Sequence, residues 1–126
     1  MTERDGSPRS RRWIGRRGER IAVSWLRSQG HSILARNYRA PRGGEVDIIA
    51  RKQRLLLFIE VKTRSGGQRI RPLDAVDSHK QALIERGARH WIRQLGQEKP
   101  AWRFDVLEVL LEDGKRPVVR QIRNAF

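Results

Sequence analysis

The sequence predicts a mixed α/β domain in which helices pack against a central sheet of about five strands. Two segments repeat apolar residues at helical spacing, five short segments are rich in Val, Ile, Leu and Phe, and Gly or Pro residues separate most of them. The order along the chain is helix, three strands, helix, two strands, which is typical of helices layered on a sheet. A chain of 126 residues has room for one such domain with one modest core.

The first 17 residues stand apart from this pattern. The stretch MTERDGSPRSRRWIGRR has no sustained apolar period and is rich in Gly, Ser, Pro and Arg. We expect either a basic, disordered arm that folds onto nucleic acid or a tail without a role. The single α/β domain then spans residues 18–126.

The first predicted helix covers residues 18–29 and ends at Gly30. Its apolar face contains Ala22, Val23 and Leu26. Glu19 lies on the same side of the helix. A carboxylate in the first turn can simply favour the helix dipole, or it can be aimed into a site, and spacing alone favours the first alternative.

Three strands are predicted next, at residues 32–38, 45–51 and 55–63, with the turn APRGG between the first two. The stretch RSGGQR at residues 64–69 is predicted to be a loop. A second helix covers residues 78–95, where Ser78 and Gln81 fit a capping box. The last two strands are predicted at residues 102–111 and 117–123, the latter at an edge of the sheet because it begins with a proline.

The charge of the chain indicates a polyanionic partner. Lys and Arg number 28 against 14 Asp and Glu, a formal net charge of +14, and a basic chain gains affinity for nucleic acid by releasing condensed counterions. An anionic membrane surface is the weaker alternative, because no basic amphipathic helix with bulky apolar anchors is present. No apolar run approaches the roughly 18 residues of a membrane span, no signal-peptide pattern opens the chain, and cysteine is absent. A cytoplasmic protein is expected.

Charged residues interrupt the second and third strands, where they are unexpected. If Gln53 and Arg54 form the turn, Asp47 lies opposite Glu60 and Glu45 lies opposite Lys62, all on one face of the sheet.

Two opposed carboxylates repel each other unless solvent, a shared proton or a cation intervenes. One interpretation is a site for a hard divalent ion such as Mg²⁺ or Mn²⁺. The other is a Lys62–Glu45 ion pair beside a solvated Asp47–Glu60 edge, which the apolar stretch LLLFIEV disfavours.

The spacing of Asp47 and the tripeptide EVK at residues 60–62 resembles the signature of the PD-(D/E)XK nuclease superfamily. Longer strings, among them RRGERIA, ARNYRAPRGGEVDIIA, FIEVKTR, RFDVLEV and RNAF, resemble the bacterial YraN-like family, whose function is uncharacterised and whose fold is similar to archaeal Holliday-junction resolvases. The resemblance implies a restriction-endonuclease-like fold and metal-dependent phosphodiester hydrolysis, and it covers about residues 15–126.

The resemblance assigns roles to individual residues. It implies Asp47 and Glu60 as metal ligands, with the Val61 carbonyl as a third contact, and Lys62 as the active-site lysine. Glu19 matches an acidic residue that the resolvase branch brings to the same site, which reverses the preference for a dipole role.

Basic residues around this set are candidates for phosphate contact. Lys80 matches a lysine of the YraN-like pattern, and the expected contacts with the nucleic-acid backbone come from Arg64, Arg69 and Arg71, with Gly67 allowing close approach. The superfamily's proline before Asp47 is absent, so Glu45 is either a carboxylate beside the metal ligands or a partner for Lys62.

The predicted function is therefore a metal-dependent nuclease using Mg²⁺ or Mn²⁺, acting on branched or single-stranded DNA rather than RNA. The alternatives are a nucleic-acid-binding protein that keeps the fold without turnover, and an assembly factor that meets RNA or an acidic protein. A junction resolvase needs two active sites, so the resemblance also implies a homodimer.

Overall fold

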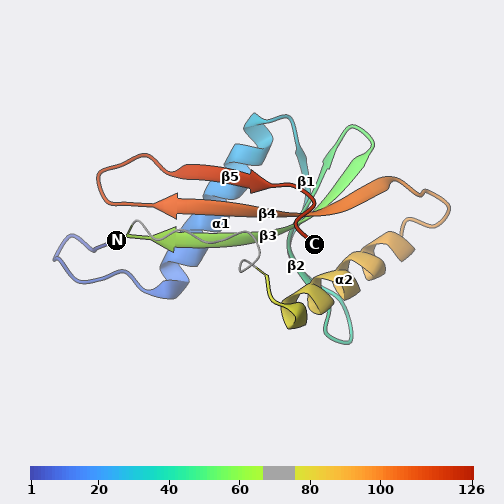
Figure 1. Ribbon diagram of the computed structural model, residues 1–126, viewed down its shortest axis with the longest axis horizontal. Coiled ribbons are helices and arrows are strands. Elements are labelled where there is room, and N and C mark those ends of the chain that lie inside the picture. The colour runs from blue at the N-terminus through green and yellow to red at the C-terminus, as the bar shows by residue number, and fades with distance from the viewer. Residues whose placement is uncertain (67–75) are drawn as a thin grey trace.

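The computed structural model describes residues 1–66 and 76–126. Its elements are α1 (Arg11–Ser28), β1 (Ser32–Arg39), β2 (Glu45–Lys52), β3 (Leu55–Ser65), α2 (Ser78–Arg93), β4 (Ala101–Leu111) and β5 (Val118–Ile122). The strands form one sheet in chain order (Figure 1). Of the strand pairs that the structure describes, only β3 and β4 run parallel, because the connection through α2 carries the chain back across the sheet. The predicted α/β class and element order are confirmed.

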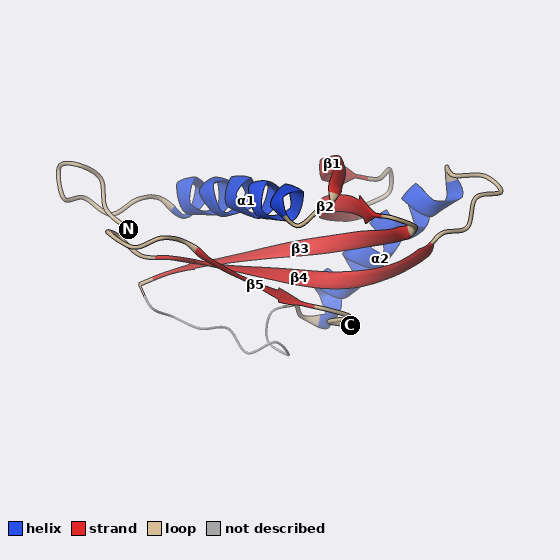
Figure 2. Cartoon of the chain, turned by 90° about the horizontal axis from the view of Figure 1, so that it is seen from above, coloured by secondary structure: helices blue, strands red, loops and turns tan. Residues whose placement is uncertain are grey.

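The two helices cover opposite faces of the sheet (Figure 2). On one face, α1 buries Ala22, Val23 and Leu26 against β2, β3 and β4, as its spacing predicted. On the other face, α2 buries Ile84 and Ala88. The apolar runs of β3 and β4 are buried on both sides, which explains why they read as continuous rather than alternating.

The first helix starts at Arg11 rather than at the predicted residue 18. Ser10 caps it by accepting a hydrogen bond from the Trp13 N–H at 3.1 Å, and Ile14 packs against the apolar cluster under α1. This cap and this contact outweigh the glycines that suggested an unstructured segment. That the basic arm orders on nucleic acid stays a prediction.

The second helix is capped by Asp77, not by Ser78 as predicted. The Asp77 carboxylate accepts a hydrogen bond from the Lys80 N–H at 2.8 Å. Gln81 does not complete a capping box; its side-chain amide donates to the Val76 carbonyl oxygen at 3.0 Å. The cap fixes the first turn of α2, on which Lys80 stands.

Side-chain alternation in β1 and β2 changes face at Asn37 and Asp47. Val46 packs on the α2 side of the sheet and Ile48 on the α1 side, although strict alternation would place both on one face. Asn37, at the facing position of β1, has a φ of 50°, a left-handed conformation that asparagine adopts more readily than most residues. Asp47 therefore stands where its carboxylate can meet groups from both faces.

Candidate active site

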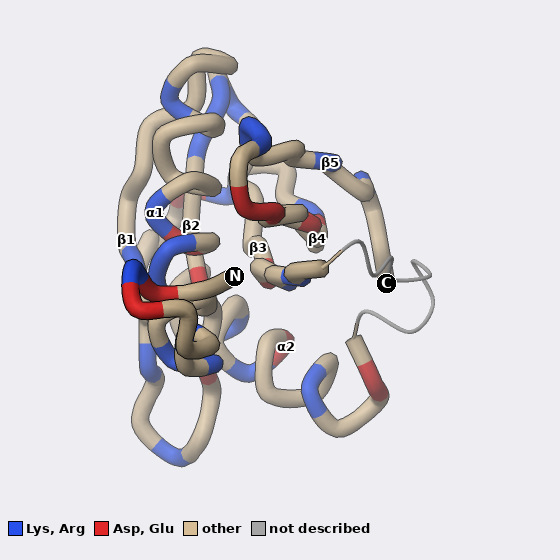
Figure 3. Tube along the Cα trace, turned by 90° about the vertical axis from the view of Figure 1, so that its left-hand side faces the viewer, with Lys and Arg blue, Asp and Glu red and all other residues tan. Residues whose placement is uncertain are grey.

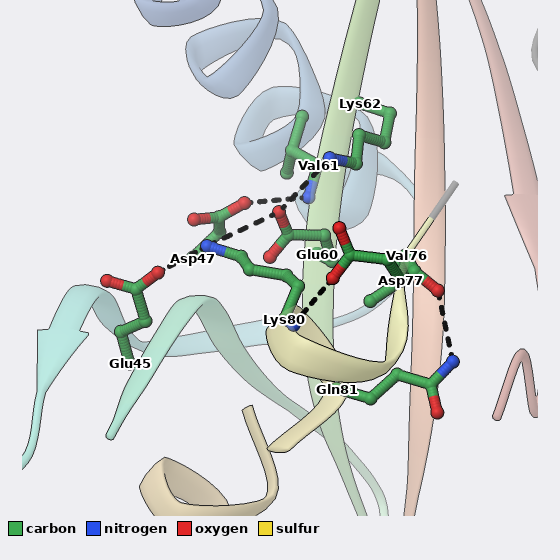
Figure 4. Close-up of polar contacts among 9 residues, drawn as sticks. All are labelled: Glu45, Asp47, Glu60, Val61, Lys62, Val76, Asp77, Lys80 and Gln81. Carbon is green, nitrogen blue, oxygen red and sulfur yellow. Dashed lines mark hydrogen bonds and ion pairs between the residues drawn. The ribbon is translucent and has the colours of Figure 1, made fainter. Parts of the chain in front are cut away.

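The β2–β3 hairpin has the register that the sequence predicted. Its ladder runs from Lys52 opposite Leu55 to Ile48 opposite Ile59 and ends there. Asp47 and Glu60 follow the last pair. The Asp47 Oδ2 atom accepts a hydrogen bond from the Val61 N–H at 2.9 Å, so a side chain continues the contact where main-chain pairing stops (Figure 4).

Glu60 is a buried residue of the predicted site, with 4% of its surface exposed. The ammonium groups of Lys62 and Lys80 lie 3.8 Å and 3.7 Å from its Oε1 atom (Figure 4). Its Oε2 atom is buried without a hydrogen-bond partner among the described residues. Burial, with the Asp47 carboxylate adding to it, raises the pKa of Glu60 from 4.5 to about 8 against the pull of both lysines.

Glu45 does not pair with Lys62, which was one of the two alternatives that the sequence left open for it. Glu45 forms an ion pair with Lys80 of α2 and a weaker one with Arg39 at 3.6 Å, while Lys62 lies against Glu60. The cause is the end of the hairpin ladder at Ile48, beyond which β2 pairs only with β1, and β3 pairs only with β4. The hydrogen bond from Lys80 lowers the pKa of Glu45.

Lys80 is held between two carboxylates. Burial on its own lowers the pKa of Lys80, but the hydrogen bond to Glu45 and the charges of Glu60 and Asp47 outweigh burial and raise it. The Lys80 ammonium is therefore charged at neutral pH and is held beside the carboxylates of Glu45 and Glu60.

A cavity of about 570 Å³ opens between α1 and the second half of β3. Its lining residues are Arg11, Ile14, Gly15, Glu19, Asp47, Val61, Thr63, Arg64 and Ser65. Four residues predicted for the site, Glu19, Asp47, Val61 and Arg64, thus share one cavity. A smaller cavity of about 130 Å³ lies on the other side of Asp47 and includes Glu45 and Lys80.

Gly18 lets α1 approach β3 closely enough to place Glu19 at the cavity. A Cβ atom at residue 18 would lie 1.9 Å from the Thr63 Oγ1 atom. Glu19 is half-buried, and burial and the nearby Asp47 carboxylate raise its pKa. Its Oε1 atom has no hydrogen-bond partner in the part of the chain that the structure describes. The sequence analysis did not identify the roles of Gly18 and Asn37 in shaping the site. Two features could have indicated them: a glycine directly before Glu19, and an asparagine, a residue common in turns, inside a predicted strand.

Two predicted residues are not placed. Arg69 and Arg71, with the neighbouring Gly67, lie outside the described residues.

The oxygen atoms suit a hard divalent cation. The donors are carboxylates from α1, β2 and β3, and two of them, Glu19 and Glu60, have a buried oxygen that no described residue hydrogen-bonds. Within residues 1–66 and 76–126, however, no three acidic, histidine or cysteine side chains already gather as a metal cluster.

Residues 18–109 match the model of "Uncharacterised protein family UPF0102". The chain belongs to this family. Relatives named UPF0102 protein include that of Trichlorobacter lovleyi, 45% identical over 90% of this chain and 89% of its own length. That of Symbiobacterium thermophilum is 44% identical, over 91% of this chain and 97% of its own. The UPF0102 assignment confirms the resemblance to the YraN-like family.

Among solved structures, the UPF0102 chain is similar to Archaeoglobus fulgidus Hjc, described as a Holliday junction resolvase from an archaeal hyperthermophile. The TM-score is 0.47 at 20% sequence identity, over 85% of this chain and 73% of Hjc. Neither helix that the structure describes has the length and apolar character needed to cross a bilayer.

Proposed function

We propose that this chain is a metal-dependent nuclease that hydrolyses phosphodiester bonds. The observation that carries the proposal is the position of Asp47 beside both Glu19 and Glu60 in a chain of net charge +14. Among the described residues, Glu19 and Glu60 each have a buried oxygen without a hydrogen-bond partner. A protein that only bound nucleic acid would gain nothing from acidic groups turned toward phosphate. The spacing of Asp47, Glu60 and Lys62 resembles the PD-(D/E)XK signature.

Asp47 and Glu60, with the carbonyl of Val61, would hold Mg²⁺ or Mn²⁺, and Glu19 would complete the set from α1. When bound, such an ion lowers the pKa of a water ligand and stabilises charge on phosphate oxygens. The high pKa of Glu60 fits this role, because a carboxylate that resists ionisation alone is stabilised by a cation.

The basic side chains at the site have two proposed roles, one at the reacting phosphate and one along the bound strand. Lys62 and Lys80 both lie within 4 Å of Glu60, where their ammonium groups can hold an attacking water or a non-bridging phosphate oxygen. Arg64 lines the larger cavity and can grip the backbone of a bound strand. Glu45 keeps Lys80 in place through their ion pair, and both residues line the smaller cavity.

The substrate follows from the type of contact. Arg and Lys side chains that meet phosphate carry no base information, so shape or flexibility of the nucleic acid should matter more than sequence. We propose branched or single-stranded DNA in preference to RNA, and a homodimer where two strands of a junction are cut.

The test is cleavage of labelled duplex, single-stranded, flapped and four-way-junction DNA, and of RNA, in Mg²⁺, Mn²⁺ or EDTA. Asp47→Asn purified in parallel controls for contaminating nucleases. We expect cutting that needs the metal and disappears in the variant while binding persists. Cleavage that survives Asp47→Asn overturns the site, and tight binding without cleavage of any substrate favours the non-catalytic binding protein.

A further inference from the structure

A basic groove lies beside α2, apart from the two cavities that Asp47 lines. It has a volume of about 670 Å³ and is lined by Pro41, Arg42, Arg86, Arg89, His90 and Arg93. Among residues 1–66 and 76–126, no carboxylate forms an ion pair with any of these four arginines. Four guanidinium groups that share one groove repel each other, and an anion would relieve that repulsion.

Three of the arginines follow one face of the helix. Arg86, Arg89 and Arg93 are separated by three and four residues, so they project to the same side of α2. At a rise of about 1.5 Å per residue they extend over roughly 10 Å, which is long enough to meet more than one phosphate. A single small anion would leave part of this row unpaired.

The turn between β1 and β2 completes the groove and is packed firmly in place. A Cβ atom at Gly44 would lie 2.5 Å from the Gly87 nitrogen, so the turn touches the backbone of α2 directly. Arg42 adopts a φ of 67°, a left-handed conformation that costs an arginine energy. The hydroxyl of Tyr38 also contacts His90. Figure 3 shows basic positions on the turn and on α2 at the same end of the molecule.

We propose that this groove binds the sugar–phosphate backbone of duplex nucleic acid beyond the candidate active site. The inference rests on the proposed function in taking nucleic acid as the ligand. The same turn connects the two places, because Glu45 at its end holds Lys80, whereas Arg42 at its tip faces the groove.

The geometry gives the length of nucleic acid involved. Along α2, Arg86 lies about 9 Å and Arg93 about 20 Å from Lys80 at a helical rise of about 1.5 Å per residue. Base pairs are spaced about 3.4 Å along the duplex, so roughly six base pairs of flanking duplex reach the far end of the groove. Shorter flanks should lose the arginine contacts.

The experiment compares two triple variants that remove the same charge. The groove variant is Arg86→Gln, Arg89→Gln and Arg93→Gln. The control is Arg54→Gln, Arg116→Gln and Arg123→Gln, whose arginines are exposed and line neither the groove nor the active-site cavities. Affinity for fluorescent DNA and RNA duplexes is measured in EDTA at several salt concentrations, and cleavage in Mn²⁺ with flanks of two to twelve base pairs.

The groove variant should bind about 10- to 100-fold more weakly at low salt, with a salt slope reduced by two to three, since each lost phosphate contact removes about 0.9. The control should change by less than threefold. Arg42→Gln, which leaves α2 intact, should reduce the slope by about one. If the groove variant loses affinity for only one of the two duplexes, DNA or RNA, that duplex is the nucleic acid that the groove binds. Circular dichroism verifies that each variant is folded.

Two results separate this inference from the proposed function. Equal affinity and equal slopes for the groove and control variants overturn the groove even if wild-type protein cuts DNA. A selective loss of binding in the groove variant supports the groove even if no substrate is cut. Cleavage that falls for flanks shorter than about six base pairs in wild type, but not in the groove variant, supports both.

Discussion

Replacing Glu60 with glutamine should stabilise the metal-free protein at high pH while abolishing cleavage. The folded protein keeps a proton on Glu60 up to about pH 8, because burial and the Asp47 carboxylate raise its pKa, whereas the unfolded chain releases that proton near pH 4.5. Between these values the folded state binds more protons than the unfolded state. The free energy of unfolding therefore falls as pH rises through this window.

The shift in the pKa of Glu60 sets an upper limit on how far the free energy of unfolding can change with pH. Each pH unit between the two pKa values lowers the free energy of unfolding by at most about 1.4 kcal/mol. Ionising Glu60 in the folded protein therefore costs at most roughly 5 kcal/mol of stability. Glutamine has nearly the shape of glutamate and carries no charge. At pH 5 the variant should match wild type within about 1 kcal/mol, and at pH 8.5 it should be more stable by a few kcal/mol.

Urea denaturation in EDTA at pH 5, 6, 7, 8 and 8.5 measures the difference. Glu45→Gln is the matched control of opposite sign. The hydrogen bond from Lys80 lowers the pKa of Glu45, so ionised Glu45 stabilises the fold above its ordinary pKa and that contribution is lost as pH falls. Glu45→Gln should destabilise the protein at pH 8. Parallel pH profiles for wild type and Glu60→Gln would refute the account of Glu60.

Three further variants test the geometry. Gly18→Ala should destabilise the fold by about 1–3 kcal/mol and reduce cleavage, because its Cβ meets Thr63, and Thr63→Ala in the same chain should restore part of both in urea melts and cleavage assays. Asn37→Val should lose about 1–2 kcal/mol through its positive φ while Asn37→Gly stays near wild type, as thermal melts would show. Asp105→Ala should cost about 1–3 kcal/mol, because it removes the buried carboxylate that accepts hydrogen bonds from Arg103, the Gln121 amide and the Asn124 N–H, but leave cleavage per folded molecule unchanged.

The sequence predicted the fold class and the order of helices and strands along the chain, because both depend on apolar patterning. The uninterrupted apolar run before Glu60 and the helical spacing of Ala22, Val23 and Leu26 each have one stable placement in a layered domain. The hairpin register was predictable as well, because the turn at Gln53 and Arg54 fixes which residues are opposed. Helix starts were less predictable, since the single cap at Ser10 decided where α1 begins.

The partners within the site could not be read from the hairpin alone. Glu45 pairs with Lys80, a residue of α2 that lies 35 positions away, so the pairing depends on how α2 docks on the sheet. The change of face at Asn37 and Asp47 has no counterpart in regular alternation, which assumes an unbroken strand. Tertiary packing, rather than local pattern, sets both features.

We propose that Glu19, Asp47 and Glu60 together hold one divalent cation, and Mn²⁺ binding tests this site without a choice of nucleic-acid substrate. Isothermal titration calorimetry at pH 8 would compare wild type with Asp47→Asn, Glu60→Gln and the control Glu45→Gln. We expect one Mn²⁺ per wild-type chain, retention of that ion in Glu45→Gln, and its loss in the other two variants. Equal Mn²⁺ binding by wild type, Asp47→Asn and Glu60→Gln, or no binding by wild type, would rule out this metal site.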